Sequence, residues 1–172
     1  MRSNLETLLS IAKQAARAAA TVHRRAEPDR LGVGTKSSPL DLVTEIDREA
    51  EQQPVSAIHA ARPYDAIIGE EGTAIPGTSG GCWILDPLDG TTNFVDGSPA
   101  YAVAVGVEID GKRVLGVVYD TYHQRLYAGI VGGGAQCEGR PIAVRTTADL
   151  SRALIGTGFL PNATVRNSQG EV

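Results

Sequence analysis

The pattern of hydrophobic and polar positions predicts two helices in the N-terminal third of the chain. Leucine and alanine residues recur at helical spacing over residues 5–24. A second helix is predicted to begin at Thr44, whose hydroxyl can cap the first turn, and to end before Pro63. Pro54 lies inside this segment and predicts either a kink or two shorter helices. The connector at 26–40 is rich in glycine and proline and is predicted to be irregular or extended.

Beyond residue 65 the pattern changes to short strands. Apolar runs at 66–68 and 83–85 indicate two strands, separated by a glycine-rich loop at 72–81 that we expect to be mobile. Valines alternate with small residues over 101–108, and the Asp110-Gly111 pair that follows is typical of a two-residue hairpin turn. Further strands are predicted at 114–119, 125–130, 142–144 and 154–158, with a flexible glycine turn at 132–134. We therefore expect an α+β fold, with helices packed on a mostly antiparallel sheet built from residues 66 to 158.

Composition narrows the class of protein. With 172 residues the chain is long enough for one domain with a real core. A net charge of −4 gives no basic footprint, so nucleic acid is not an expected partner on composition. No apolar stretch reaches membrane-spanning length and no signal sequence is recognisable, so we expect no membrane association and a cytoplasmic location. Cys82 and Cys137 fit no metal spacing and are interpreted as reduced thiols.

The candidate chemistry is concentrated in residues 83–94, Trp-Ile-Leu-Asp-Pro-Leu-Asp-Gly-Thr-Thr-Asn-Phe. A short apolar strand leads into Asp86 and Asp89, which flank a bend fixed by Pro87. Two carboxylates at this spacing can face a common space, and oxygen ligands suit a hard cation such as Mg²⁺. The N–H groups of the Gly-Thr-Thr turn that follows can face an anion. Metal and phosphate binding is the first hypothesis for this segment.

Other charged residues precede this segment at the ends of predicted elements. Glu70 and Glu71 follow one strand, Asp47 lies in the first turn of the second helix, and Lys36 lies in the connector. Converging acids repel one another and tend to stay protonated unless a cation compensates them. Each residue taken alone has a simpler interpretation, because such acids also form turns, solvated surfaces and helix N-termini, and such lysines are common on surfaces. The three histidines lie outside these segments and are interpreted as surface or structural residues: His23, His59 and His123.

Taken together, these segments resemble the inositol monophosphatase family of Mg²⁺-dependent, lithium-sensitive phosphatases. Residues 83–94 match the family pattern without a gap, and the segments 36–47 and 68–71 resemble its two upstream motifs in the same order. The resemblance extends from the first helix to Phe159. It implies that the helices and sheet are the N-terminal part of a layered αβαβα sandwich, which is often a homodimer.

The resemblance implies a definite set of metal ligands. Glu70, Asp86 and the backbone carbonyl of Leu88 would hold a first metal ion. Asp86 and Asp89 would contribute to a second, with Asp86 bridging the two ions. Glu70 would also reach a third, weaker ion through water.

The resemblance also implies roles for the residues around phosphate. Gly90 and Thr91 would offer backbone amides to it, and the Thr91 hydroxyl, paired with Asp47, would orient and deprotonate the attacking water. The implied reaction is Mg²⁺-dependent hydrolysis of a small polyol phosphate monoester by a metal-activated water, most simply inositol monophosphate.

The chain departs from the family pattern beyond residue 159. The family's second signature, Trp-Asp followed by small residues, supplies an acid to the second metal and does not occur here. We therefore expect an incomplete inositol monophosphatase-like domain at 1–159, a divergent tail at 160–172, and at best weak activity. Alternatives are a related phosphatase acting on fructose 1,6-bisphosphate, histidinol phosphate or adenosine bisphosphates, or a fragment that binds metal or another protein without catalysis.

Overall fold

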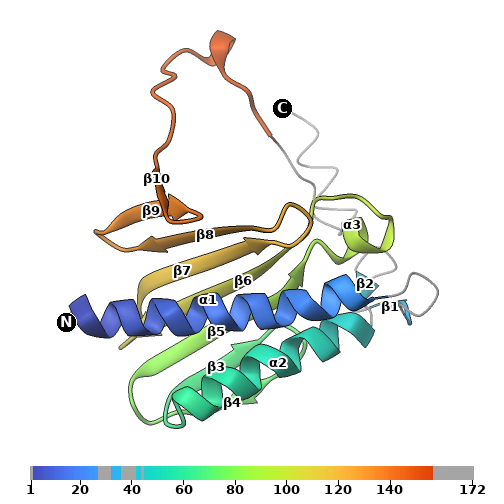
Figure 1. Cartoon of the computed structure of the whole chain (residues 1–172), viewed down its shortest axis with the longest axis vertical. Coiled ribbons are helices and arrows are strands. Elements are labelled where there is room, and N and C mark those ends of the chain that lie inside the picture. Colours follow the sequence, from blue (N-terminus) through green and yellow to red (C-terminus); the bar gives the residue numbers. More distant parts are fainter. Residues whose placement is uncertain (1, 27–31, 36–41, 44, 157–172) are drawn as a thin grey trace.

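The structure, a computed structural model, describes residues 2–26, 32–35, 42–43 and 45–156, and it places two long helices against one face of an eight-stranded sheet (Figure 1). The predicted α+β fold with a mostly antiparallel sheet is confirmed. The predicted boundary between residues 159 and 160 lies outside the described residues and stays a prediction.

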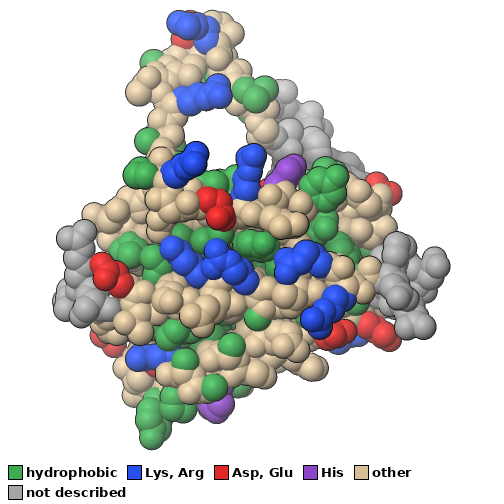
Figure 2. Space-filling model, viewed as in Figure 1, with side chains coloured by type: hydrophobic (Ala, Val, Ile, Leu, Met, Phe, Trp, Pro, Cys, Tyr) green, Lys and Arg blue, Asp and Glu red, His purple; other side chains and the backbone are tan. Residues whose placement is uncertain are grey.

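The first helix, α1 (Arg2–Arg25), confirms the helix predicted from the apolar spacing. Its inner side is rich in alanine, and Ala12, Ala16 and Ala19 are fully buried. Such small side chains let α1 lie close to the second helix and to the middle strands of the sheet. Lys and Arg side chains lie on the outward side of this helical layer (Figure 2). None of the described helices is long and apolar enough to cross a membrane.

The second helix, α2 (Glu45–Ala61), is a single helix that contains Pro54. Of the two alternatives predicted for this segment, two separate helices are therefore excluded. Proline removes one backbone hydrogen bond, but Ala50 and Ile58 on either side of it are fully buried and anchor both halves of the helix. The proposed Thr44 cap lies outside the described residues.

The large sheet has the strand order β10-β9-β8-β7-β6-β5-β3-β4, and only the β3–β5 pair is parallel. Its strands are β3 (Ala66–Gly69), β4 (Ala74–Ile75), β5 (Gly81–Asp89), β6 (Ala102–Ile109), β7 (Lys112–Asp120), β8 (Arg125–Ile130), β9 (Gly134–Cys137) and β10 (Arg140–Ile142). The shorter elements are the antiparallel pair β1 (Gly34–Thr35) and β2 (Leu42–Val43), helix α3 (Thr91–Val95) and the turn η2 (Leu150–Arg152).

The strands with clear alternation were predicted well. In β6, Val103, Val105 and Val107 face the helices and are buried. The turn between β6 and β7 has positive φ at both Asp110 (51°) and Gly111 (71°), as a two-residue hairpin with the predicted sequence requires. Strand β8 has the predicted bounds. Both cysteines are free thiols, as interpreted from the sequence.

Strands without apolar alternation were predicted less well. The loop expected at 72–81 contains β4, which is too short to show a pattern. Strand β9 was missed, and β10 lies at 140–142 rather than 142–144. The strand expected at 154–158 is wrong over residues 154–156, which form no strand, and Leu154 is 97% exposed. Apolar residues there meet no neighbouring strand among the described residues, so periodicity alone was misleading.

A buried polar network joins the end of α2 to strand β5. Trp83 of β5 is fully buried, and its indole Nε1 donates a hydrogen bond to Asp65 Oδ2 at 2.9 Å. Arg62 donates to both carboxylate oxygens of Asp65 at 2.8 and 3.1 Å, and Ser79 donates to Oδ1. Burial alone would raise the pKa of Asp65, but the hydrogen bonds and the Arg62 charge together hold it below its usual value. The ionised carboxylate therefore ties the end of α2 to β5.

We predict that Asp65→Asn destabilises the fold, because an amide cannot accept all four hydrogen bonds and leaves buried donors unpaired. The expected loss is about 1–3 kcal/mol in the free energy of unfolding, measured by urea denaturation near neutral pH. Since the pKa of Asp65 is lowered in the folded state, its contribution is present above the unfolded pKa of about 3.9 and is lost as the pH falls below it. The difference in the free energy of unfolding between wild type and Asp65→Asn should therefore become smaller in acid.

The matched control is Arg113→Gln, which breaks the Arg113–Glu108 ion pair of 3.7 Å, where the Arg113 side chain is 90% exposed. That change should alter stability by less than about 0.5 kcal/mol. Equal losses in the two variants would contradict the role given to the Asp65 network.

Candidate metal and phosphate site

The parallel pairing of β3 and β5 brings two acidic residues side by side. Gly69, the last residue of β3, is registered opposite Leu85, so Glu70 lies beside Asp86, which is still within β5. The Glu70 N–H donates to the Leu85 carbonyl at 3.0 Å and extends the ladder by one bond. The predicted placement of both acids at strand ends is therefore confirmed for Glu70.

Asp86, in contrast, does not end its strand. Strand β5 continues to Asp89 and pairs with Ala104 and Ala102 of β6, with one extra residue on the β5 side. Such a β-bulge bends the strand and redirects its side chains. The Leu88 N–H donates to Asp86 Oδ1 at 3.1 Å across Pro87, which closes a local turn. The sequence-based expectation that the strand ends at its two carboxylates is confirmed at Asp89, the last residue of β5, while Asp86 lies inside the strand because the bulge accommodates Pro87.

Gly90 turns the chain into the short helix α3. Its φ of 93° lies in the left-handed region, and a Cβ there would lie 2.7 Å from the Ala100 carbonyl. Asn93 donates from Nδ2 to the same carbonyl at 2.7 Å. Glycine is therefore required at position 90 by both backbone conformation and space. The N–H groups at the start of α3 precede any carbonyl of their own helix, which is the arrangement expected of a turn that faces an anion.

The hydroxyl of Thr91 connects this turn to α2. Its Oγ1 lies 2.8 Å from Asp47 Oδ1 and 3.1 Å from the Leu88 carbonyl, so its single proton has two acceptors. Asp47 lies in the first turn of α2 and is 1% exposed. The predicted pairing of Thr91 with Asp47 is present, across 44 residues of sequence.

The charges at this edge of the sheet act most strongly on Asp86. Burial, the charge of Glu70, a hydrogen bond with Glu70 and the charge of Asp89 raise the pKa of Asp86 to about 8, against the lowering effect of the Leu88 N–H. The two neighbouring acids, Glu70 and Asp89, have exposed side chains. Within the described residues, no three His, Cys, Asp or Glu side chains are spaced to hold a metal ion as they stand. The predicted acids thus interact with one another, but among the described residues they do not form a complete metal coordination site.

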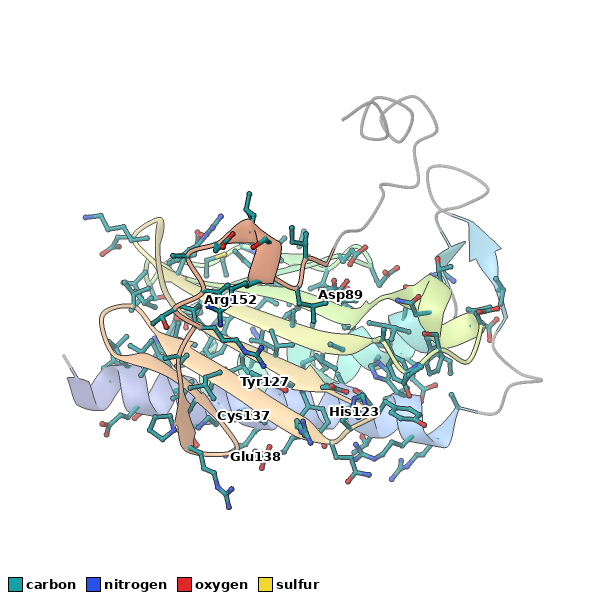
Figure 3. All side chains as sticks on the ribbon, turned by 90° about the horizontal axis from the view of Figure 1, so that it is seen from above. Asp89, His123, Tyr127, Cys137, Glu138 and Arg152 are labelled. Carbon is teal, nitrogen blue, oxygen red and sulfur yellow. The ribbon has the colours of Figure 1, made fainter. Side chains whose placement is uncertain are left out.

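A cavity of about 420 Å³ adjoins the Gly90 turn. Figure 3 labels Asp89 and Tyr127, which both line it. Other polar residues around this space are Asn93, Tyr101 and Asp120. Asp120 also makes a hydrogen bond to the ring of His123, with 2.9 Å between Oδ2 and Nδ1. This contact fixes the Asp120 carboxylate at the cavity. The cavity combines acceptors and hydroxyl groups next to the candidate anion site.

One buried acid near the site was not singled out by the sequence. Glu51 lies one helical turn after Asp47, on the same side of α2, and is 3% exposed. The four-residue spacing of two acids on one helix was the available signal. His23 of α1 packs against the rings of Phe94 and Tyr101, with centroids 5.8 and 6.0 Å away, which confirms its structural interpretation.

His23 is held in the neutral form beneath the site. Its Nδ1 lies 3.2 Å from the Thr121 hydroxyl. Burial lowers the pKa of His23 to about 4, although the Pro87 carbonyl and the Asp47 charge oppose part of this change. Its Nε2 is buried and makes no well-formed hydrogen bond to any described residue. A neutral ring at this position supports the site through packing.

Part of the predicted upstream motif lies outside the described residues. This applies to Lys36 and Asp41, whose positions relative to the acids stay predictions. Within the described residues the structure brings together two groups: Glu70, Asp86 and Asp89, and Asp47 and Thr91. The backbone of Leu88 connects them, because its N–H donates to Asp86 and its carbonyl accepts from Thr91.

We predict that the metal-free chain loses stability as the pH rises, because folding raises the pKa of Asp86 to about 8. In the unfolded chain the pKa of an aspartate is about 3.9. The proton bound by Asp86 therefore stabilises the fold fully below that pH, and this contribution is lost as the pH rises through the folded pKa. Asp86→Asn should remove this dependence. Urea unfolding in the presence of a chelator, at about pH 5 and about pH 9, measures this effect. Relative to wild type, the free energy of unfolding of Asp86→Asn should be higher at about pH 9 than at about pH 5.

The exposed residue Asp96 offers a matched control. Asp96→Asn should follow the wild-type pH dependence. Parallel curves for wild type and Asp86→Asn would mean that the acids do not interact as described.

Comparison with known proteins places this chain in a family. The Nus factor SuhB of Pseudomonas aeruginosa is 41% identical, over 90% of this chain and 59% of that protein. The inositol-1-monophosphatase SuhB of Mycobacterium tuberculosis is 42% identical, over 96% of this chain and 63% of that protein. The crystal structure of the extragenic suppressor protein suhB from Bartonella henselae has a TM-score of 0.78 at 35% identity, and the match covers 82% of this chain and 55% of that one.

The chain thus spans less than two thirds of the length of these relatives. The family model described as the inositol monophosphatase family matches residues 4–172. Because both the family model and relatives above 40% identity cover nearly the whole chain, this chain belongs to the inositol monophosphatase family.

Proposed function

We propose that this chain carries the metal-binding and water-activating part of a Mg²⁺-dependent phosphatase that hydrolyses a small polyol phosphate monoester, with inositol monophosphate as the first substrate to test. The observation that carries the proposal is the hydrogen bond from Thr91 to the buried carboxylate of Asp47, beside three interacting acids. Relatives named inositol-1-monophosphatase support the choice of substrate.

The acidic residues fit a hard divalent cation in their chemistry. Glu70, Asp86 and Asp89 offer only carboxylate oxygens, and the Leu88 carbonyl is close to the same turn. The pKa of Asp86 is raised partly because the negative charges of Glu70 and Asp89 disfavour a further negative charge beside them. A bound cation would offset this repulsion. Because Glu70 and Asp89 are exposed, their side chains have room to rotate toward a shared ion. We assign Glu70, Asp86 and Leu88 to one ion, and Asp86 and Asp89 to a second.

The protein groups divide the work of hydrolysis between them. When bound, divalent cations would acidify water and neutralise charge on the phosphoryl oxygens. The Gly90 and Thr91 N–H groups would orient the phosphate. The Thr91 hydroxyl would accept a proton from the attacking water while passing its own proton to Asp47. A bond would then form from the water oxygen to phosphorus as the ester bond breaks. The leaving alkoxide would take a proton from solvent water, and Asp47 would return the proton it received to solvent.

The cavity beside Gly90 provides room for the alcohol part of the substrate. Its volume of about 420 Å³ and its polar lining, including Asp89, Asn93 and Asp120, suit a small molecule with several hydroxyl groups. Homodimer formation, implied by the family resemblance, and the weak activity expected of these 172 residues both stay predictions.

The proposal is tested by measuring release of inorganic phosphate from inositol monophosphate with and without Mg²⁺, and with added Li⁺. We expect release that requires Mg²⁺ and is inhibited by Li⁺, at a low rate. A panel with fructose 1,6-bisphosphate, histidinol phosphate and an adenosine bisphosphate would reveal a different substrate. Mg²⁺ binding without any phosphate release would favour a non-catalytic fragment instead.

Two substitutions should separate metal binding from water activation. Asp86→Asn removes the carboxylate common to both proposed ions and should weaken Mg²⁺ binding by more than about 100-fold in calorimetry. Thr91→Ala leaves the carboxylates in place, so Mg²⁺ affinity should be unchanged while turnover falls by roughly 100-fold or more, because the proton path to Asp47 is lost.

Control variants are available in the same turn. Thr92→Ala alters the exposed neighbouring threonine and should leave both quantities unchanged. Unaltered Mg²⁺ affinity in Asp86→Asn, or full turnover in Thr91→Ala, would contradict the assignment of roles.

A further inference from the structure

Helix α2 carries a second buried carboxylate for which the reaction described above has no use. Glu51 follows Asp47 by one helical turn and is 3% exposed, although ionised acids are rarely so deeply buried without strong partners. The two carboxylates lie on one side of the helix, and Asp47 already pairs with the phosphate turn through Thr91. Glu51 points toward a different segment of the site.

The partners of Glu51 are backbone groups of the turn that carries Glu70. Its Oε2 accepts a hydrogen bond from the Glu71 N–H at 2.8 Å, and its Oε1 accepts one from the Thr73 N–H at 3.0 Å. The turn is closed by a bond of 2.8 Å from the Gly69 N–H to the Thr73 carbonyl. Hydrogen bonds to a charged acceptor are stronger than neutral ones, so this carboxylate holds the turn at two points.

Gly69 shows how closely the carboxylate approaches the turn. A Cβ at position 69 would overlap the carboxylate atoms of Glu51. The backbone conformation of Gly69 is not one that demands glycine, because its φ is not positive. Glycine is therefore needed at position 69 to leave space for the Glu51 carboxylate, and not because of the backbone conformation of the turn.

Glu70 lies between two fixed points as a result. Its own N–H is held by Leu85 of β5 at 3.0 Å, and the next residue is held by Glu51. We infer that Glu51 is a positioning residue, which sets the direction in which Glu70 leaves β3 and so presents its carboxylate beside Asp86. This inference rests on the proposed function, because Glu70 is proposed there as a metal ligand.

A purely structural role for Glu51 makes a different prediction. If the carboxylate only tied α2 to the sheet, its loss would lower stability and leave the Mg²⁺ affinity of the folded protein unchanged. A positioning role instead requires a looser 70–73 turn and weaker Mg²⁺ binding, with turnover at saturating Mg²⁺ largely retained. The split between metal affinity and maximal rate therefore distinguishes the two roles.

The first test is Glu51→Gln, which keeps the shape of the side chain but turns one acceptor into a donor that faces a backbone N–H. Hydrogen exchange of the metal-free chain should show faster exchange at the Glu71 and Thr73 amides. Calorimetry should show Mg²⁺ binding weakened about 10-fold, within the range seen for residues that orient metal ligands. The matched control is Glu49→Gln on the exposed side of the same helix, which should change neither quantity.

A second variant keeps the test decisive if Glu51→Gln does not fold. Gly69→Ala leaves the carboxylate present but displaces it, because the added methyl group occupies its position. It should reproduce the faster exchange at Glu71 and Thr73 and the weaker Mg²⁺ binding. Glu51→Gln thus changes the carboxylate, and Gly69→Ala changes the backbone position against which it packs.

The outcomes separate this inference from the proposed function. Unchanged exchange at the turn, or unchanged Mg²⁺ affinity despite faster exchange, would overturn the positioning role of Glu51. A wild-type chain that binds no Mg²⁺ would contradict the proposed function, and the positioning of a metal ligand would fall with it. The exchange measurement, made without metal, would then report only on the turn.

Discussion

The repulsion between carboxylates at the ends of β3 and β5 is the constraint that the surrounding structure has to overcome. The parallel register places Glu70 beside Asp86, and the β-bulge keeps Asp89 close enough to raise the pKa of Asp86 further. A fold that needed only stability would not gather acids in this way, because each one disfavours the ionised form of the next. The arrangement is understandable if a cation is bound there, and the neighbouring elements serve to hold the acids in place despite their repulsion.

Helix α2 is the element that holds them. Its first turn supplies Asp47 to Thr91, its second turn supplies Glu51 to the turn after β3, and its end is tied to Trp83 of β5 through Asp65. These contacts connect one helix to three segments that are far apart in the sequence. Ala50 and Ile58 lie on either side of Pro54 and are fully buried. The position of α2 is therefore determined by packing in the core rather than by the site. The site therefore inherits its geometry from hydrophobic packing.

Much of this could be predicted from the sequence, for reasons that differ between elements. Alternating valines identify β6, and the Asp110-Gly111 pair identifies its hairpin, because both patterns are local. The acids at 70, 86, 89 and 47 were recognised through motifs, and the Thr91–Asp47 pairing came from the family resemblance. The bulge at Pro87, the strand β4 and the buried Glu51 were not predicted, because each depends on which segments are neighbours in space. Glu51 differs from any exposed helical acid only through the backbone groups that the fold places next to it.

The central claim is that the acids after β3 and β5 form a site for divalent cations. It is tested most directly by a crystal structure of this chain grown with Mn²⁺ in place of Mg²⁺, with the ion located by its anomalous scattering. We expect a peak bounded by carboxylate oxygens of Glu70 and Asp86, with the Leu88 carbonyl nearby and a further ion toward Asp89. A structure with Mn²⁺ in the crystal but no anomalous peak at these carboxylates would contradict it.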